Sequence, residues 1–161
     1  MSRVIPMVNE RDEIIGYKPS DDVTKGEIYR VSALWVTNSN GDILLAQRGL
    51  HESHDPGRWG PAVAGTVEKD ESYYENVLKE AGEEIGLTGT RLTKAKKQRV
   101  SEKYDYFTQW YTAMVDTPAE EFNIQKEELE QVRWFGREEL ARELRDHPER
   151  YLDLHWALAE L

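Results

Sequence analysis

Three glutamates, Glu80, Glu83 and Glu84, stand close together in a segment with a helical sequence pattern. Their spacing of three and four residues places them on one side of an α-helix. Carboxylates so close repel one another and destabilise a helix by roughly 0.2–0.5 kcal/mol per pair. A hard divalent cation removes this repulsion, and Mg²⁺ prefers oxygen ligands of this kind. The spacing therefore indicates a candidate metal site, although a solvated acidic helix face would give the same pattern.

The helix that carries these glutamates is the clearest element in the sequence. Ser72 and Glu75 have the spacing of an N-terminal capping box, and Gly86 is a typical C-terminal stop. Apolar residues recur at helical spacing and predict one buried face, formed by Tyr74, Val77, Leu78, Ala81 and Ile85. The glutamates are predicted to point roughly 120° away from that face.

Strands surround this helix in the predicted order of elements. Apolar runs predict strands at residues 4–8, 14–17, 29–37, 43–47, 61–67, 97–100, 106–115 and 131–135. The first two form a hairpin within about residues 3–18, and residues 48–60 read as a long loop. Two C-terminal helices, 138–144 and 151–161, are predicted within about residues 138–161. This mixture predicts one α/β domain over residues 1–161, an α/β/α sandwich around a mixed β-sheet.

The composition excludes several classes of protein. The chain has 161 residues, of which 39% are hydrophobic and 32% charged, as in a soluble globular domain. A formal charge of −10 argues against binding nucleic acid along its backbone. No apolar run is long enough to cross a bilayer, and the first residues do not resemble a signal peptide. Without cysteine, thiolate metal sites and thiol nucleophiles are excluded. We expect a cytoplasmic protein that binds neither nucleic acid nor membranes.

The segment around the glutamates matches a longer motif. Residues 65–87 read Gly65-x5-Glu71-x7-Lys79-Glu80-Ala81-x-Glu83-Glu84-x-Gly86-Leu87. They resemble the Nudix box, G-x5-E-x7-R-E-U-x-E-E-x-G-U, in which U is a bulky apolar residue. If Lys79 counts for arginine, independent residue draws give such a match about once in 10⁴. The likeness extends to 43–48 and 56–61, and so covers about residues 29–87.

The resemblance implies a Nudix-type α/β/α sandwich that hydrolyses phosphoanhydrides with Mg²⁺, or with Mn²⁺ in its place. It implies that Glu80 and Glu84 are the principal metal ligands and that Glu83 is a ligand or a base acting through water. Lys79 replaces the usual arginine that orients the glutamates; it keeps the charge but loses the planar fork. The resemblance gives structural roles to Gly65, Glu71 and Gly86.

Candidates for substrate binding lie before the box. Arg48 and Arg58 can hold substrate phosphates, because arginine suits bidentate contacts with anions. Trp59 can stack on a base or sugar, although aromatic residues in strands usually belong to the core. The same two interpretations apply to Tyr106 and Trp110.

Other residues are weaker candidates. In this family the base sometimes lies outside the box, and the candidates for it are Glu120, Glu121, Glu127 and Glu128. Each of them also fits a plain surface position. His51 and His54 have a spacing that can touch a metal, and Tyr104 lies about where dinucleoside-polyphosphate hydrolases of the family carry a tyrosine. The basic residues at 94–99 form a basic patch in the sequence, but a solvated edge strand explains them more simply than a binding site.

The N-terminal hairpin resembles the branch of the family related to isopentenyl-diphosphate isomerase. That isomerase needs a cysteine where this chain has Ala64, so isomerase chemistry is not expected. We favour metal-dependent hydrolysis of a phosphoanhydride bond in a nucleoside di- or triphosphate or another nucleoside-diphosphate-linked compound. The alternatives are a non-catalytic nucleotide-binding module, a prenyl-diphosphate isomerase and an acidic structural domain. The leaving group and the number of metal ions stay open, and the chain is compatible with a homodimer.

Overall fold

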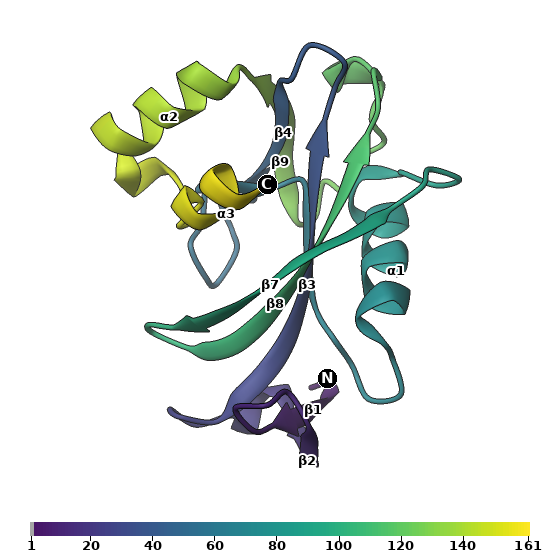
Figure 1. Cartoon of the computed structure of the whole chain (residues 1–161), viewed down its shortest axis with the longest axis vertical. Coiled ribbons are helices and arrows are strands. Elements are labelled where there is room, and N and C mark those ends of the chain that lie inside the picture. Colours follow the sequence, from purple (N-terminus) through teal and green to yellow (C-terminus); the bar gives the residue numbers. More distant parts are fainter. Residues whose placement is uncertain (1) are drawn as a thin grey trace.

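The computed structural model describes residues 2–161, in which a mixed β-sheet lies between α1 on one side and α2 and α3 on the other (Figure 1). The strands are β1 (Val4–Val8), β2 (Ile14–Pro19), β3 (Ile28–Thr37), β4 (Ile43–Arg48), β5 (Trp59–Pro61), β6 (Val63–Thr66), β7 (Thr93–Ser101), β8 (Asp105–Met114) and β9 (Leu129–Phe135). The helices are α1 (Tyr73–Ile85), α2 (Arg137–Asp146) and α3 (His155–Glu160), with 3-10 turns at Ser20–Asp22, Ala119–Glu121 and Pro148–Arg150. Within residues 2–161, no helix has both the length and the apolar character needed to cross a bilayer.

Strand β3 is the centre of the sheet. It runs parallel to β8 along its whole length, from Ile28 opposite Asp105 to Thr37 opposite Met114. It is antiparallel to β1, β4 and β6, while β4 also pairs with β5 and β9. The predicted α/β fold with a mixed sheet is therefore confirmed.

The two faces of β3 belong to two different hydrophobic cores, because successive side chains of a strand point to opposite faces. Leu34 and Val36 pack in the cluster that contains Val77, Ala81 and Ile85 of α1. Ala33 and Trp35 pack in the second cluster, which contains Leu140 and Leu144 of α2 and Leu154 beside α3. The sheet thus separates α1 from the two C-terminal helices.

Two predicted elements differ in the structure. The strand predicted at 61–67 is divided, since β5 pairs with β4 whereas β6 pairs with β3. The helix predicted over 151–161 begins only at His155. Before it, Tyr151 forms a parallel bridge with Trp59, and the Leu152 amide donates to the Trp59 carbonyl at 2.8 Å. This pairing with β5 keeps the chain extended until the Asp153 carboxylate accepts a hydrogen bond from the His155 amide at 3.2 Å.

The predicted ends of α1 are confirmed, but its predicted buried face is partly wrong. Ser72 and Glu75 form the capping box, and Gly86 adopts a left-handed φ of 67° at the C-terminus. Tyr74 and Leu78, however, are 45% and 43% exposed. The buried face is rotated toward the glutamates and consists of Asn76, Val77, Glu80, Ala81, Glu84 and Ile85. Periodicity missed this because it counts only apolar residues.

The N-terminal hairpin is fastened to the rest of the domain through Asp12. The Asp12 carboxylate accepts hydrogen bonds from Arg30 Nε at 2.7 Å, from the Tyr73 hydroxyl at 2.9 Å and from Lys97 Nζ. Burial raises the pKa of Asp12, but the hydrogen bonds from Lys97, Arg30 and Tyr73 outweigh it and hold the pKa below its ordinary value. One carboxylate therefore joins the hairpin to β3, α1 and β7.

Replacing Asp12 with asparagine is expected to lower the free energy of unfolding by about 2 kcal/mol, because charge-assisted hydrogen bonds are lost. Asparagine tolerates the left-handed φ of 59° at this position, so the turn is kept. Since the folded pKa is the lower one, the contribution of Asp12 is full above about pH 4 and is lost as the pH falls through the folded pKa. Urea unfolding at pH 7 and pH 3 measures both effects. Asp21→Asn, at an exposed position, is the control. Equal stability of the two variants would show that Asp12 does not fasten the hairpin to the rest of the domain.

Candidate functional site

The three glutamates that the sequence predicts as metal ligands line a pocket of about 220 Å³, called the carboxylate pocket below. Glu80, Glu83 and Glu84 of α1 form one wall, and Ala64, Gly65 and Thr66 of β6 lie beside them. Glu80 and Glu84 are only 7% and 8% exposed, so a fully solvated acidic face is excluded for these two residues. Glu83 is exposed at the pocket.

Gly65 allows β6 and α1 to approach each other. A Cβ atom at this position would lie 2.6 Å from Cγ and 2.8 Å from Cδ of Glu80. Only glycine leaves the Glu80 side chain in its observed position, which explains physically why a glycine stands 15 residues before Glu80.

Substituting Gly65 by alanine is expected to lower the free energy of unfolding by about 1 kcal/mol, because the added methyl group forces Glu80 out of its place. The matched control is Gly16→Ala, since a Cβ on Gly16 meets nothing within 4 Å. Thermal unfolding of both variants measures the difference. If Gly65→Ala is as stable as Gly16→Ala, the close approach is not a constraint.

Burial disfavours the charged forms of two carboxylates of α1, Glu80 and Glu84. Burial, with the neighbouring charge of Glu83, raises the pKa of Glu80 to about 7. Burial, with the charges of Glu80 and Glu128, raises the pKa of Glu84 to about 9. A bound cation would offset both effects, since an opposite charge nearby favours the ionised carboxylate.

The donor set fits a hard cation in its chemistry, because it consists of carboxylate oxygens. Within residues 2–161, no three histidine, aspartate or glutamate side chains already converge as a finished metal site. The three glutamates of α1 nevertheless line one pocket. Glu80, Glu83 and Glu84 are the residues that would hold the metal.

Lys79 points away from these ligands and braces the loop between β6 and α1. Its Nζ lies 2.7 Å from Glu68 Oε2 and 2.7 Å from Glu71 Oε2. Glu71 also accepts hydrogen bonds from the Glu68 amide at 2.8 Å and from Asn76 Nδ2 at 3.1 Å. Lys79 thus fixes the loop that leads into α1.

Four charged residues of the carboxylate pocket come from parts of the chain outside α1 and β6. Arg48 lines the pocket, donates from Nε to the His54 carbonyl at 2.9 Å and lies 3.6 Å from Glu52. Glu128, one of the predicted candidates outside the box, also lines it. Arg3 and Glu52 line it as well and were not predicted. No sequence signal separates them from other surface charges.

Arg58 and Trp59 lie elsewhere. Arg58 forms an ion pair with Asp55 at 3.0 Å and lines a second, larger pocket of about 380 Å³. The Trp59 ring packs edge-on against Phe135, with their centroids 5.2 Å apart, in the cluster beside the C-terminal helices. Arg48 and Arg58 are joined by a backbone hydrogen bond of 2.9 Å, yet they line different pockets, and Trp59 packs outside both.

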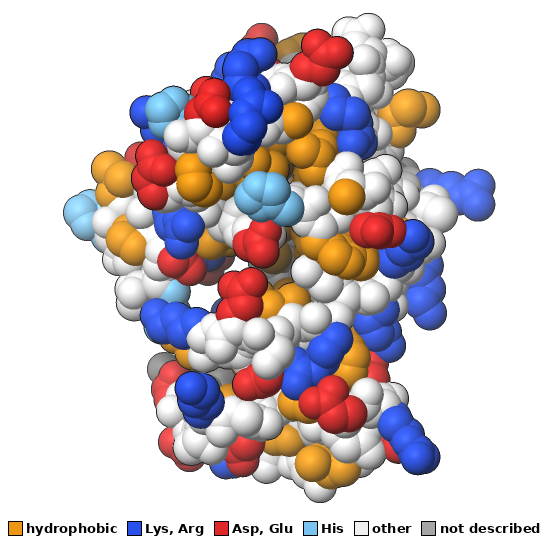
Figure 2. Space-filling model, turned by 60° about the vertical axis from the view of Figure 1, so that its left-hand side comes forward, with side chains coloured by type: hydrophobic (Ala, Val, Ile, Leu, Met, Phe, Trp, Pro, Cys, Tyr) orange, Lys and Arg blue, Asp and Glu red, His pale blue; other side chains and the backbone are white. Residues whose placement is uncertain are grey.

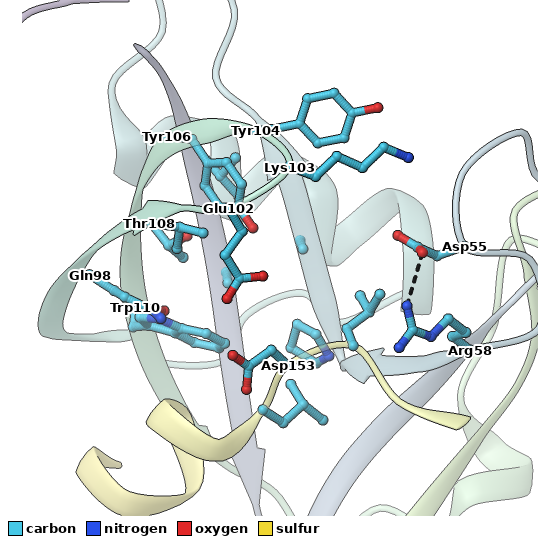
Figure 3. Close-up of a pocket in the computed structure, with 17 residues that line it drawn as sticks. Asp55, Arg58, Gln98, Glu102, Lys103, Tyr104, Tyr106, Thr108, Trp110 and Asp153 are labelled. Atoms are coloured by element: carbon cyan, nitrogen blue, oxygen red, sulfur yellow. Dashed lines mark hydrogen bonds and ion pairs between the residues drawn. The ribbon is translucent and has the colours of Figure 1, made fainter. Parts of the chain in front are cut away.

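The second pocket, called the aromatic pocket below, adjoins the first. Tyr106 and Trp110 of β8 lie in its wall, and Ala64 lines both pockets (Figure 3). The position where an isomerase would need its thiol therefore carries a methyl group at the junction.

Of the remaining candidates, Tyr104 lines the aromatic pocket, and the others are dispersed. His51 and His54 are exposed, and the His54 ring lies edge-on to Tyr104. Glu120, Glu121 and Glu127 are exposed and line neither pocket. The basic residues of β7 form ion pairs, namely Lys96 with Glu160, Lys97 with Asp12, and Arg99 with Glu10 and Asp105.

Comparison with known proteins identifies the family. The model of the NUDIX domain matches residues 27–155, most of the chain. An uncharacterized Nudix hydrolase of Pseudomonas aeruginosa is 29% identical over 146 residues, which cover 88% of this chain and 83% of that protein. Another from Listeria monocytogenes is 28% identical over 141 residues, covering 83% and 80%.

Solved structures agree on the fold. DR0079 from Deinococcus radiodurans has a TM-score of 0.84 at 21% identity, with 97% of both chains covered. An Ap4A hydrolase of Caenorhabditis elegans has a TM-score of 0.62 at 18% identity, covering 82% of this chain and 93% of that one. The family match begins after the β1–β2 hairpin. It includes α1 and every lining residue of both pockets except Arg3. The chain belongs to the Nudix family and is a Nudix hydrolase.

Proposed function

We propose that this Nudix hydrolase uses Mg²⁺, with Mn²⁺ as a substitute, to cleave the phosphoanhydride bond of a nucleoside-diphosphate-linked small molecule. The observation that carries the proposal is the pair of pockets that adjoin at Ala64. One offers carboxylates for a cation and arginines for phosphates, and the other offers an aromatic wall. Nucleoside di- and triphosphates present these two chemistries at their two ends.

The residues of the carboxylate pocket receive the following roles. Glu80 and Glu84 hold the cation, and Glu83 is either a further ligand or the base. When bound, a divalent cation supplies Lewis-acid stabilisation of the charge on the phosphates. Arg48 and Arg3 add positive charge on the side of the pocket where the phosphates enter.

The chemical step is substitution at phosphorus. The oxygen of a water molecule forms a bond to one phosphorus atom, and the bond from that phosphorus to the bridging oxygen breaks. The electron pair leaves with the departing phosphate, and the proton of the water passes to a carboxylate. Glu83 and Glu128 are the two carboxylates proposed for this transfer, because both line the pocket and Glu128 faces the charges of Glu80 and Glu84.

A product screen tests the proposal. Purified protein is incubated with Mg²⁺ and nucleoside diphosphates, nucleoside triphosphates and nucleotide sugars in ¹⁸O-water, and the products are identified by mass. We expect one class to give two phosphate-terminated products, one of them carrying a single ¹⁸O atom. Tight binding of a nucleotide without turnover would instead establish a non-catalytic binding module. A prenyl diphosphate is added to the screen, and its conversion to a double-bond isomer without ¹⁸O, identified by NMR because isomers have the same mass, would establish isomerase chemistry.

A further inference from the structure

The aromatic pocket has a wall built from alternate residues of two parallel strands. Val31 and Ala33 of β3 and Tyr106, Thr108 and Trp110 of β8 all line it. Trp110 is fixed in place, since its Nε1 donates to Gln98 Oε1 at 3.1 Å and its ring packs edge-on against Trp35. Because this wall belongs to the centre of the sheet, it is held by strand pairing, whereas Glu102 and Asp153 reach the pocket from loops.

Thr108 is a polar group without a partner in this wall. Its residue is 5% exposed, and no side-chain hydrogen bond formed within residues 2–161 involves its hydroxyl. Its neighbours on the wall, Val31 and Ala33, carry no polar side-chain atoms. The hydroxyl therefore lines the pocket with its donor and acceptor capacity free, and a ligand hydroxyl in the pocket can bond to it.

Acidic side chains stand around the same space. Glu102, from the turn between β7 and β8, and Asp153, just before α3, direct their carboxylates into the pocket (Figure 3). Asp55 lies on the opposite wall in its ion pair with Arg58. Burial raises the pKa of the Tyr106 hydroxyl, and the nearby charges of Glu102, Asp153 and Asp55 raise it further. All three carboxylates therefore act on the same part of the pocket.

The acids of the pocket differ in how far they are neutralised. Asp153 lies 3.1 Å from His155 Nδ1 and also accepts from the His155 amide. Glu102 forms no ion pair with any residue in the described range 2–161. Figure 2 shows acidic side chains beside a hollow near the middle of the visible face. Arg58 and Lys103 also line the pocket, but Arg58 is paired with Asp55, and the three acids outnumber the two bases. An additional phosphate or carboxylate brought into this space would therefore face an excess of negative charge.

We propose that the aromatic pocket selects a substrate whose non-phosphate end is uncharged and presents hydroxyl donors, as a ribose does, and rejects one that carries a further anionic group there. Glu102 and Asp153 accept hydrogen bonds from these hydroxyls, and Thr108 binds deeper in the pocket. The inference rests on the proposed function, because Ala64 joins this pocket to the carboxylates that carry out the cleavage. A site built around hydrogen bonds to a substrate hydroxyl discriminates strongly against compounds that lack it.

Two variants test the inference against matched substrates. A nucleoside 5′-diphosphate is compared with its 2′-deoxy and its 3′-phosphorylated forms by kcat/KM. We expect the parent enzyme to prefer the first over the 3′-phosphorylated form by about tenfold or more. Glu102→Gln keeps the size of the side chain and removes its charge, and it should reduce this preference at least about threefold. Glu138→Gln, an exposed change on α2, should leave the preference unaltered.

Thr108 is tested by a pair of variants that separates the hydroxyl from packing. Thr108→Val is expected to lower kcat/KM for the ribose substrate about tenfold, whereas Thr108→Ser should stay within about threefold of the parent. Thermal unfolding confirms that each variant is folded. If Thr108→Val is unstable, or is inactive toward every substrate, the result for Glu102→Gln decides the inference.

A hexose 1-diphosphate and its 6-phosphorylated form, measured in parallel, distinguish a sugar as the source of the hydroxyls from a nucleoside. A changed preference on either substrate pair supports the inference and names the source. An unchanged preference on both pairs, in a parent enzyme that hydrolyses diphosphates, overturns it while the proposed function stands. A parent enzyme that hydrolyses no diphosphate compound refutes the proposed function itself.

Discussion

Replacing Glu84 with glutamine is expected to lower kcat/KM by roughly a hundredfold to a thousandfold, the cost of removing one preorganised charged group from an active site. The substitution keeps the size of the side chain and an oxygen that can accept from the Ala64 amide, 3.4 Å away. It removes the negative charge that we propose as a metal ligand. Loss of activity would then come from lost chemistry and not from a cavity or an altered backbone.

Stability gives an independent measurement for the same variant. Because burial and like charges raise the pKa of Glu84 to about 9, the ionised group is unfavourable in the metal-free protein. Glu84→Gln should therefore melt at the same temperature as the parent or higher without metal, and should lose the stabilisation that Mg²⁺ gives to the parent. Glu138→Gln is the control for both measurements. Parent-like activity in Glu84→Gln would remove Glu84 from the metal site.

Lys79→Ala is expected to lower kcat/KM about tenfold to a hundredfold, whereas Lys79→Arg should preserve or modestly raise it. The lysine holds Glu68 and Glu71 at 2.7 Å each and so fixes the loop before α1. Breaking a charged network of this kind costs on the order of 1–3 kcal/mol. Arginine restores two-pronged hydrogen bonding and matches the pattern of the family.

The comparison for Lys79 is made as kcat/KM at saturating Mg²⁺, so that weakened metal binding is not mistaken for lost chemistry. Lys96→Ala is the matched control, since Lys96 forms its ion pair with Glu160, away from both pockets. Activity of Lys79→Ala within about twofold of the parent would mean that the brace does not support the glutamates.

Local features of the fold were predictable from the sequence because they depend on neighbours along the chain. The capping box of Ser72 and Glu75, the stop at Gly86 and the turn-separated strands depend on nearby residues and were confirmed. Likewise, the three glutamates of α1 share one pocket because their spacing alone places them on one side of the helix.

The pockets could not be predicted, because they depend on contacts between distant segments. The aromatic pocket requires the parallel register of β3 and β8, which sets Val31 opposite Thr108 across a long stretch of chain. Arg3 lines the carboxylate pocket, and the next residue, Val4, accepts a hydrogen bond from the Lys69 amide at 2.9 Å, which joins two segments far apart in the sequence. Trp59 was predicted as a stacking residue, but strand β5 turns its ring toward Phe135. Such outcomes follow from strand pairing, which the order of residues does not reveal.

Metal dependence tests the central claim most directly. The protein is freed of metal with excess chelator, and the initial rate of phosphoanhydride cleavage is measured for the parent and Glu84→Gln as Mg²⁺ is returned. We expect no cleavage without the cation, full recovery of the parent at millimolar Mg²⁺, and little recovery of Glu84→Gln. Undiminished cleavage by the metal-free parent would contradict the role of the carboxylate pocket as the metal site of this hydrolase.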